Sequence, residues 1–242
     1  KSISQLLPSH IHARIDELNR RVRQGEIEFQ ATVDSLQDLL DGRRRRLVLD
    51  PSEVLTSVLQ KQVDRLVEVG APTEAKQSED NFRKYLGSAI GRFIEDRPRS
   101  IVWSRICLTD VAIFDPRLRP EWLADAGEVY VYDWAKPEKC RNYGTTPLPP
   151  ETPDVLQGQW GPKYQNAKPD WVRDNLNVGE QGLIVWEGLF VYLYNGKRML
   201  DECNLDLIGS VSGGGSVPYL RWFDGRAGLC AGSVVGAGPG FG

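Results

Sequence analysis

The sequence predicts an α+β fold, with helices in the first part of its 242 residues and a small antiparallel sheet near the end. Apolar residues, mostly Leu, Ile and Val, recur at helical spacing up to residue 98. All seven Trp and all eight Tyr come after residue 84, where β-branched residues become frequent. Nine of the fifteen Pro fall between 116 and 169, and fifteen of the 24 Gly lie from 179 onward. We therefore divide the chain into a helical subdomain, 1–98, and an aromatic-rich α+β subdomain, 99–242.

Three to four amphipathic helices are expected in the helical subdomain. Two periodic stretches, 9–25 and 29–42, each end at a glycine. A third, 50–70, opens with Asp-Pro-Ser-Glu, in which Asp caps the helix, Pro takes its first position and Glu its third. A fourth begins near Thr73 and ends before Pro98. Because each helix has one apolar face, the helices are expected to pack together or on a sheet.

Strands are expected on both sides of a Pro-rich segment, where β-branched and aromatic residues replace the helical pattern. The strands expected before it are Ile101–Leu108, Val111–Phe114 and Glu128–Trp134, the last of which alternates with period two. The strands expected after it are Leu205–Val211, Val217–Phe223 and Ala227–Ala231, with glycine-rich turns between them. This second group is typical of a small antiparallel β-meander.

The segment 177–194 fits two interpretations. Its composition, with Ile184, Val185 and Val191, favours a strand. Its length of about 18 residues is long for a strand, and Asn177 with Glu180 forms a helix-capping pair. We interpret it as a buried helix.

The segment 140–170 is too Pro-rich for regular structure and too aromatic for a solvated linker, so we expect a long ordered loop. Long ordered loops in compact domains are often functional. Aromatic and basic residues in and beside this loop form the candidate binding set. Its members are Arg141, Tyr143, Trp160, Tyr164, Trp171 and Arg173.

A resemblance to a family covers residues 176–230. It is carried by Leu176-Asn177-Val178-Gly179-Glu180-Gln181-Gly182-Leu183, Cys203, Gly209-Ser210, Val217-Pro218-Tyr219-Leu220 and Gly225-Arg226-Ala227-Gly228-Leu229. This pattern resembles the C-terminal part of a family of uncharacterised bacterial proteins of unknown function. It departs from the family at Cys230-Ala231-Gly232, where aromatic residues would be expected. The resemblance implies a helix followed by a meander and a bacterial origin, and it brings no activity.

Charge and hydropathy restrict the classes of function. The chain has 30 Lys+Arg and 33 Asp+Glu, for a formal net charge of −3, which argues against binding nucleic acid through bulk positive charge. It contains no apolar run long enough for a membrane span and no signal peptide at its start. We therefore expect a soluble cytoplasmic protein.

Residues that could carry catalysis or bind metal form no recognisable site. His10 and His12, the only histidines, are two residues apart and cannot share a helix face as a metal pair. The four Cys have no Cys-x-x-Cys spacing. Cys140, between Lys139 and Arg141, is the one whose thiol pKa the neighbouring charges would lower, although an incidental loop thiol is the favoured interpretation. We expect no metal, no cofactor and no disulfide.

Carboxylates could perform acid–base work without histidine, but no spacing singles out a pair. Five lie beside apolar or aromatic residues, and each is expected to be a cap, a turn residue or an ion-pair partner. They are Asp110, Asp115, Asp133, Glu180 and Glu187. The glycine-rich end, 236–242, lacks the helix that a phosphate-binding loop must open, so we interpret it as a tail or an edge loop.

The densest charge run is Arg43, Arg44, Arg45 and Arg46. Acidic residues flank it, so we interpret it as a solvated or salt-bridged turn, with contact to a protein partner or to nucleic acid as the alternatives.

For the whole protein we favour a non-catalytic interaction or assembly module that binds another protein or itself through its helices or the Pro/Trp loop. The alternatives are an enzyme or small-ligand binder with a site under the 140–170 loop, and a nucleic-acid contact through Arg43–Arg46.

Overall fold

The computed structural model describes residues 51–96, 111–144, 151–157, 167–176, 180–200, 204–232 and 240–241. All of them belong to one compact unit, Asp50–Gly242. Helices dominate its first part and short strands its last part, so the predicted α+β class is confirmed. The first two expected helices, the strand expected at Ile101–Leu108 and most of the glycine-rich end lie outside the described residues.

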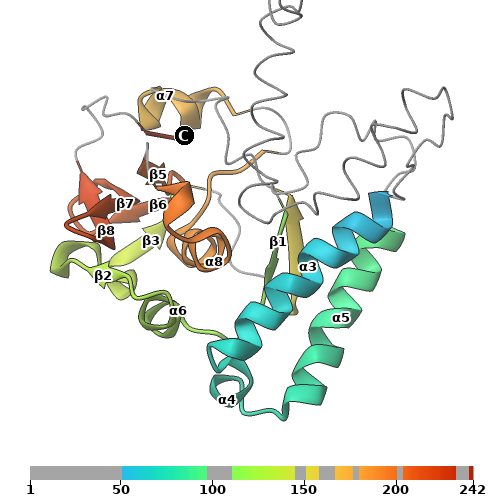
Figure 1. Ribbon diagram of the computed structural model, residues 1–242. Helices are drawn as coiled ribbons and strands as arrows, with labels where there is room; N and C mark the ends of the chain where they lie inside the picture. The colour runs from blue at the N-terminus through green and yellow to red at the C-terminus, as the bar shows by residue number, and fades with distance from the viewer. Residues whose placement is uncertain are drawn as a thin grey trace, which may run out of the picture. The chain divides into compact units, whose positions relative to one another are not determined.

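Two long helices lie side by side at the start of this unit, α3 (Pro51–Glu68) and α5 (Glu79–Glu95), with the short helix α4 (Ala71–Glu74) between them (Figure 1). The prediction of α3 is confirmed. The fourth helix begins later than expected, because Ser78 caps α5 by accepting a hydrogen bond from the Asn81 N–H.

Strand β1 (Val111–Phe114), which the sequence predicted, forms a two-stranded antiparallel sheet with β4 (Asp154–Gln157). Helices α3 and α5 pack against this pair. The Gln62 side chain of α3 binds β1 as a further strand would, since its amide donates to the Val111 carbonyl at 2.8 Å and accepts from the Ile113 N–H at 3.0 Å. These bonds satisfy backbone groups that would otherwise be buried without partners.

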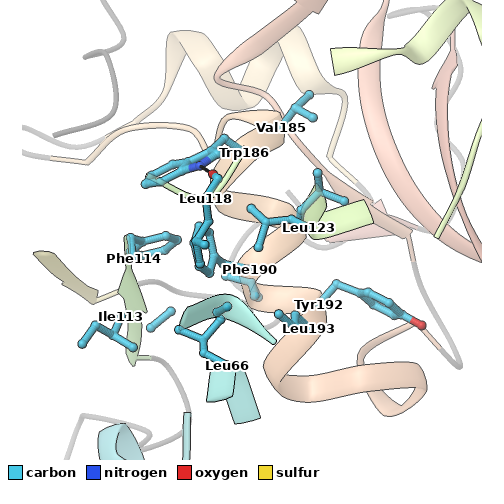
Figure 2. Packing of buried hydrophobic residues seen from close by; sticks show 14 of the residues in the cluster. Leu66, Ile113, Phe114, Leu118, Leu123, Val185, Trp186, Phe190, Tyr192 and Leu193 are labelled. Carbon is cyan, nitrogen blue, oxygen red and sulfur yellow. Dashed lines mark hydrogen bonds between the residues drawn. The ribbon is translucent and has the colours of Figure 1, made fainter. Parts of the chain in front are cut away.

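The central helix α8 (Val185–Asn195) is almost entirely buried, which confirms the predicted buried helix. It packs on α6 (Pro120–Ala126) and β1, and a 3₁₀ turn (Gly196–Met199) follows it. The rings of Trp186, Phe114 and Phe190 pack 5.0–5.5 Å apart, and the Trp186 indole donates to the Leu118 carbonyl at 2.8 Å (Figure 2).

The predicted start of α8 is wrong, because the helix begins at Val185 and not at 177. Residues 180–184 are not helical, so the Asn177–Glu180 pair does not cap this helix; 177–179 lie outside the described residues. The Glu187 carboxylate accepts from the Ile184 N–H at 3.0 Å, and the Ser210 hydroxyl accepts from the Val185 N–H at 3.0 Å. Ser210 is 25 residues from Val185, so its contribution to this cap could not be predicted from the local sequence pattern.

A five-stranded sheet has the order β2-β8-β7-β5-β9. Its strands are β2 (Tyr130–Val131), β8 (Arg226–Gly232), β7 (Val217–Phe223), β5 (Asn204–Asp206) and β9 (Gly240–Phe241). The antiparallel run β5-β7-β8 confirms the predicted meander, whereas β2 pairs with β8 in parallel. Asp224 and Gly225 turn β7 into β8 with φ of 52° and 80°, as a tight hairpin requires.

Two strand predictions and the loop prediction need correction. The expected strand Leu205–Val211 is interrupted by a turn at 208–209, so its first part lies in β5 and its end lies in β6 (Ser210–Ser212), which belongs to a different sheet. The expected strand Glu128–Trp134 is reduced to β2, because Asp133–Ala135 forms a 3₁₀ turn, which a second turn at Pro137–Lys139 follows. The segment 140–170 is not simply a loop. It contains β4 and also β3 (Cys140–Asn142), which pairs with β6 (Ser210–Ser212), and it leads into α7 (Pro169–Asp174). Residues 145–150 and 158–166 of it lie outside the described part.

One hydrophobic core joins these elements across the compositional break at residue 98. It includes Leu59 and Leu86 from the long helices, Phe114 from β1, and Leu220 and Leu229 from the five-stranded sheet. The helices before residue 98 and the strands after it therefore share a core within the described residues.

Candidate functional site

Three of the six predicted binding residues come together around one surface hollow. Arg141, Tyr143 and Arg173 line it between β3, α7 and the turn before β7. Its volume is about 510 Å³. The other lining residues are Asn142, Gly144, Asp170, Val211 and Gly215. Trp171 lies on α7 with 53% of its surface exposed and is not among the lining residues. Trp160 and Tyr164 lie outside the described residues.

Arg173 in this hollow acts as a structural connection rather than a free cation. Its Nε donates to the Ile208 carbonyl at 2.8 Å, and its Nη2 donates to the Ser210 carbonyl at 2.9 Å. Its third donor reaches Asp170 at 3.2 Å, and its guanidinium lies 3.8 Å from the centre of the Tyr143 ring. The side chain is only 6% exposed. Arg173 therefore holds α7 to the segment before β6, and Arg141 is the exposed cation of the hollow.

A second candidate surface, which the sequence analysis did not identify, is the outward side of the five-stranded sheet. Side chains alternate between the two sides of a strand. Leu220, Ala227 and Leu229 are buried in the core, so their neighbours point the other way. We call this outward surface the aromatic–arginine face. It consists of Tyr130, Tyr132, Trp134, Tyr219, Arg221, Phe223 and Arg226.

The aromatic rings along β2 form a continuous row. The Tyr130 and Tyr132 rings meet edge to face with centres 4.8 Å apart, and the Tyr132 and Trp134 rings stack at 4.9 Å. Gly228 of β8 lies next to this row, since a Cβ at that position would be in van der Waals contact with the Tyr132 ring, at 3.4 Å.

The two arginines of the face stack on its rings. The Arg226 guanidinium lies 4.1 Å from the centre of the Tyr130 ring, and the Arg221 guanidinium lies 4.6 Å from that of Phe223. Within the described part of the chain, neither guanidinium forms an ion pair with a carboxylate. The Arg221 Nε is buried without a hydrogen-bond acceptor. Both cations of the face therefore lie against aromatic rings, and Arg221 also interacts with the side chains of Tyr132 and Cys230.

The aromatic side chains of this face are unusually exposed. Tyr130 is 43% exposed, Trp134 57% and Phe223 49%. They are three of the five large hydrophobic side chains that are exposed in the described residues, the others being Tyr143 and Trp171. A cluster of exposed apolar side chains on one surface is typical of an interaction site.

The carboxylates proposed for acid–base work have structural roles where the structure describes them. Asp115 is fully buried and binds Arg117 through both oxygens, at 2.8 and 2.6 Å. Asp133 pairs with Lys136 and Lys139, whose hydrogen bonds lower its pKa. Glu187 caps α8, and burial raises its pKa to about 7. The prediction of caps and ion pairs is confirmed for these three.

Cys140 differs from the expectation in both position and electrostatics. It lies in strand β3 rather than in a loop, and burial, assisted by the nearby Glu138, raises its thiol pKa to about 11. Neither Lys139, whose ammonium binds Asp133, nor Arg141 lowers this pKa as proposed. Cys230 is buried in β8, and both thiols are free. The structure therefore favours an incidental thiol over a reactive one.

Other predicted sites fall outside the described residues or find no counterpart among them. The unplaced ones are His10, His12, Cys107, Cys203, Asp110 and Arg43–Arg46. Within the ranges that are described, no cluster of three His, Cys, Asp or Glu side chains could hold a metal ion. Over the same ranges, no helix is both long and apolar enough to cross a membrane.

Comparison of the chain with protein-family models, curated proteins and solved structures finds no match. The resemblance of residues 176–230 to a bacterial family therefore stays a prediction. Its glycines do have a packing role in this fold, since the backbones of Gly182 and Gly209 are in direct contact.

Proposed function

We propose that this protein is a non-catalytic interaction module that binds another protein through the aromatic–arginine face. The observation that carries the proposal is that Tyr130 and Phe223 of the sheet and Trp134, which stacks on Tyr132 just beyond β2, are each close to half exposed. Aromatic residues and Arg are enriched in protein interfaces and provide most of their binding energy.

The sheet face supports this function better than the hollow around Arg141 does. Two donors of Arg173 are taken by backbone carbonyls, so the hollow offers a ligand little beyond Arg141 and Tyr143. On the sheet, by contrast, Tyr132 rests on Gly228 and stacks with Trp134, so the aromatic side chains are held in place before a partner arrives. Ordering side chains in advance reduces the entropy cost of association.

The compartment in which this module works is inferred from its thiols. Cys140 and Cys230 are both free, and they lie on different strands of the described fold. Free thiols persist where the environment is reducing. We therefore infer a cytoplasmic protein, and the resemblance described above suggests that it is bacterial.

The test compares partner capture by three forms of the full chain. The first is the wild type, the second carries Trp134→Ala with Phe223→Ala, and the third carries Trp171→Ala, an equally exposed Trp on α7. A partner should be retained by the wild type and by Trp171→Ala and lost from the double variant. Because all three side chains are exposed, circular dichroism spectra should be unchanged. Capture by the double variant equal to that of the wild type would refute the proposal.

A further inference from the structure

We propose that the aromatic–arginine face recognises an acidic segment of its partner protein, with apolar side chains between the carboxylates. This inference rests on the proposed function and adds the chemistry of the partner. It follows from how Arg221 and Arg226 are held, from the surrounding charges and from the spacing of the rings.

The arginines are oriented to bind carboxylates. The guanidinium carbon of Arg226 lies 4.1 Å from the centre of the Tyr130 ring, and that of Arg221 lies 4.6 Å from the centre of the Phe223 ring. Stacking leaves the N–H groups at the edge of the guanidinium, and those groups match the two oxygens of a carboxylate. Arg226 is exposed and therefore accessible to a partner.

Among the described residues, no carboxylate near this face, including Asp224 in the β7–β8 turn, forms an ion pair with Arg221 or Arg226. Asp133 is occupied by Lys136 and Lys139 at 2.9 and 3.0 Å. Strand register places Asp206 on the same side of the sheet, opposite Tyr219, but no ion pair joins it to an arginine within the described residues. The buried Arg221 Nε also lacks an acceptor, and an unsatisfied group of this kind is uncommon in native structures. An acidic partner supplies negative charge at Arg226, the exposed arginine of the pair.

The aromatic row explains why the carboxylates should alternate with apolar residues. Ring centres follow one another at 4.8 and 4.9 Å from Tyr130 to Trp134, with Arg226 4.1 Å from the first ring. A segment that places acidic groups on Arg226 and Arg221 therefore passes over Tyr130, Tyr132 and Phe223. Burial of apolar side chains against these rings contributes to affinity, and the carboxylates fix the register.

Nucleic acid also stacks on aromatic rings and binds Arg, but the charge of this protein argues against it. Binding through phosphates typically uses several cations, and the face offers two arginines in a chain of net charge −3. A protein segment with a few carboxylates matches two arginines better.

The experiment measures binding of three labelled probes to the full chain by fluorescence anisotropy. One is a peptide of about twelve residues in which Asp and Glu alternate with Leu and Tyr, one is the same peptide with Asn and Gln in place of the acids, and one is an oligothymidine of similar length. The acidic peptide should bind about tenfold more tightly than its neutral counterpart, and its affinity should fall as salt rises.

Two variants locate the contact. Arg226→Gln should weaken binding of the acidic peptide about tenfold. Arg65→Gln, which changes an exposed arginine on α3, should leave that affinity unchanged. Because both side chains are exposed, neither substitution threatens folding.

Four results would overturn the inference. They are no binding of the acidic peptide, equal binding of the neutral peptide, wild-type affinity in Arg226→Gln, or tighter binding and displacement by oligothymidine. If one of these occurs while partner capture still depends on Trp134 and Phe223, only the acidic chemistry is wrong. If capture is independent of Trp134 and Phe223, the proposed function itself fails.

Discussion

At the scale of single residues, Glu187 shows how a local cap affects the whole fold. Its side chain is 4% exposed, and its carboxylate accepts the Ile184 N–H that begins α8. Burial disfavours the charged form and raises the pKa from 4.5 to about 7, although the backbone hydrogen bond acts in the opposite direction. Folded and unfolded chains therefore differ in protonation near neutral pH.

This difference gives stability a dependence on pH that Glu187→Gln should remove. Between about pH 4.5 and pH 7 the folded chain binds a proton that the unfolded chain has released, so the free energy of unfolding falls as the pH rises through this window. The expected loss is on the order of 3 kcal/mol. The Gln carbonyl can still accept the Ile184 N–H, so the variant should be more stable than the wild type at pH 8.

Urea unfolding of both proteins at about pH 4.5 and pH 8 measures this effect. Asp206, whose pKa burial raises to about 6, adds a slope of the same sign to both proteins. The difference between the proteins therefore isolates Glu187. Parallel pH profiles for wild type and variant would show that the Glu187 carboxyl is not perturbed.

Sequence reasoning at the residue scale identified types of residue better than it identified their roles. Arg141, Tyr143 and Arg173, which were grouped for their basic and aromatic character, line the same hollow, and their role in binding stays a prediction. The sequence could not show that the Arg173 guanidinium donates hydrogen bonds to backbone carbonyls 35 and 37 residues away. That information exists only once β6 and α7 are placed together.

At the scale of elements, periodicity predicted what local sequence determines. Helices α3 and α5 and the hairpin β7-β8 follow from apolar spacing and from the Asp224-Gly225 turn. The start of α8 and strand β3 depend on β6, which is distant in sequence, so they were missed. The aromatic–arginine face was also missed, although the alternation in 128–134 and 217–223 contained the signal.

The junction between α8 and β6 depends on glycine at position 209. The Gly209 N–H donates to the Leu183 carbonyl at 2.9 Å, and a Cβ at Gly209 would overlap the Gly182 carbonyl. Backbone cannot move aside as a side chain can, so Gly209→Ala should destabilise the fold by about 3 kcal/mol. The matched control is Gly87→Ala on the exposed side of α5, where nothing lies within 4 Å of the new Cβ.

Thermal and urea unfolding distinguish the two glycines. Gly87→Ala should stabilise the protein by up to about 1 kcal/mol, because alanine favours the helix. Gly209→Ala should lower the unfolding midpoint clearly. A Gly209→Ala midpoint equal to that of the wild type would mean that β6 and the segment before α8 are not in backbone contact.

At the scale of the whole molecule, the described helices before residue 98 and the described strands after it share one core. Leu59 of α3 is fully buried in the same cluster as Phe114, Leu220 and Leu229. The Gln62 side chain strengthens this junction through its two hydrogen bonds to β1. The amino-acid composition indicates which type of element a residue builds, and it does not indicate which core that element joins.

A shared core predicts that damage to α3 reaches the sheet that carries the aromatic–arginine face. Leu59→Ala should lower the free energy of unfolding by about 2–5 kcal/mol, because it leaves a cavity at a fully buried position. Ser57→Ala, an exposed change on the same helix, should stay within about 0.5 kcal/mol of the wild type.

Hydrogen exchange provides the decisive measurement, since amides that open only by global unfolding report the stability of the whole unit. In Leu59→Ala, exchange should accelerate in β7 and β8 by the same factor as in α3. Acceleration confined to α3 and α5 would show instead that the helices and the five-stranded sheet unfold separately, with residue 98 near a true boundary.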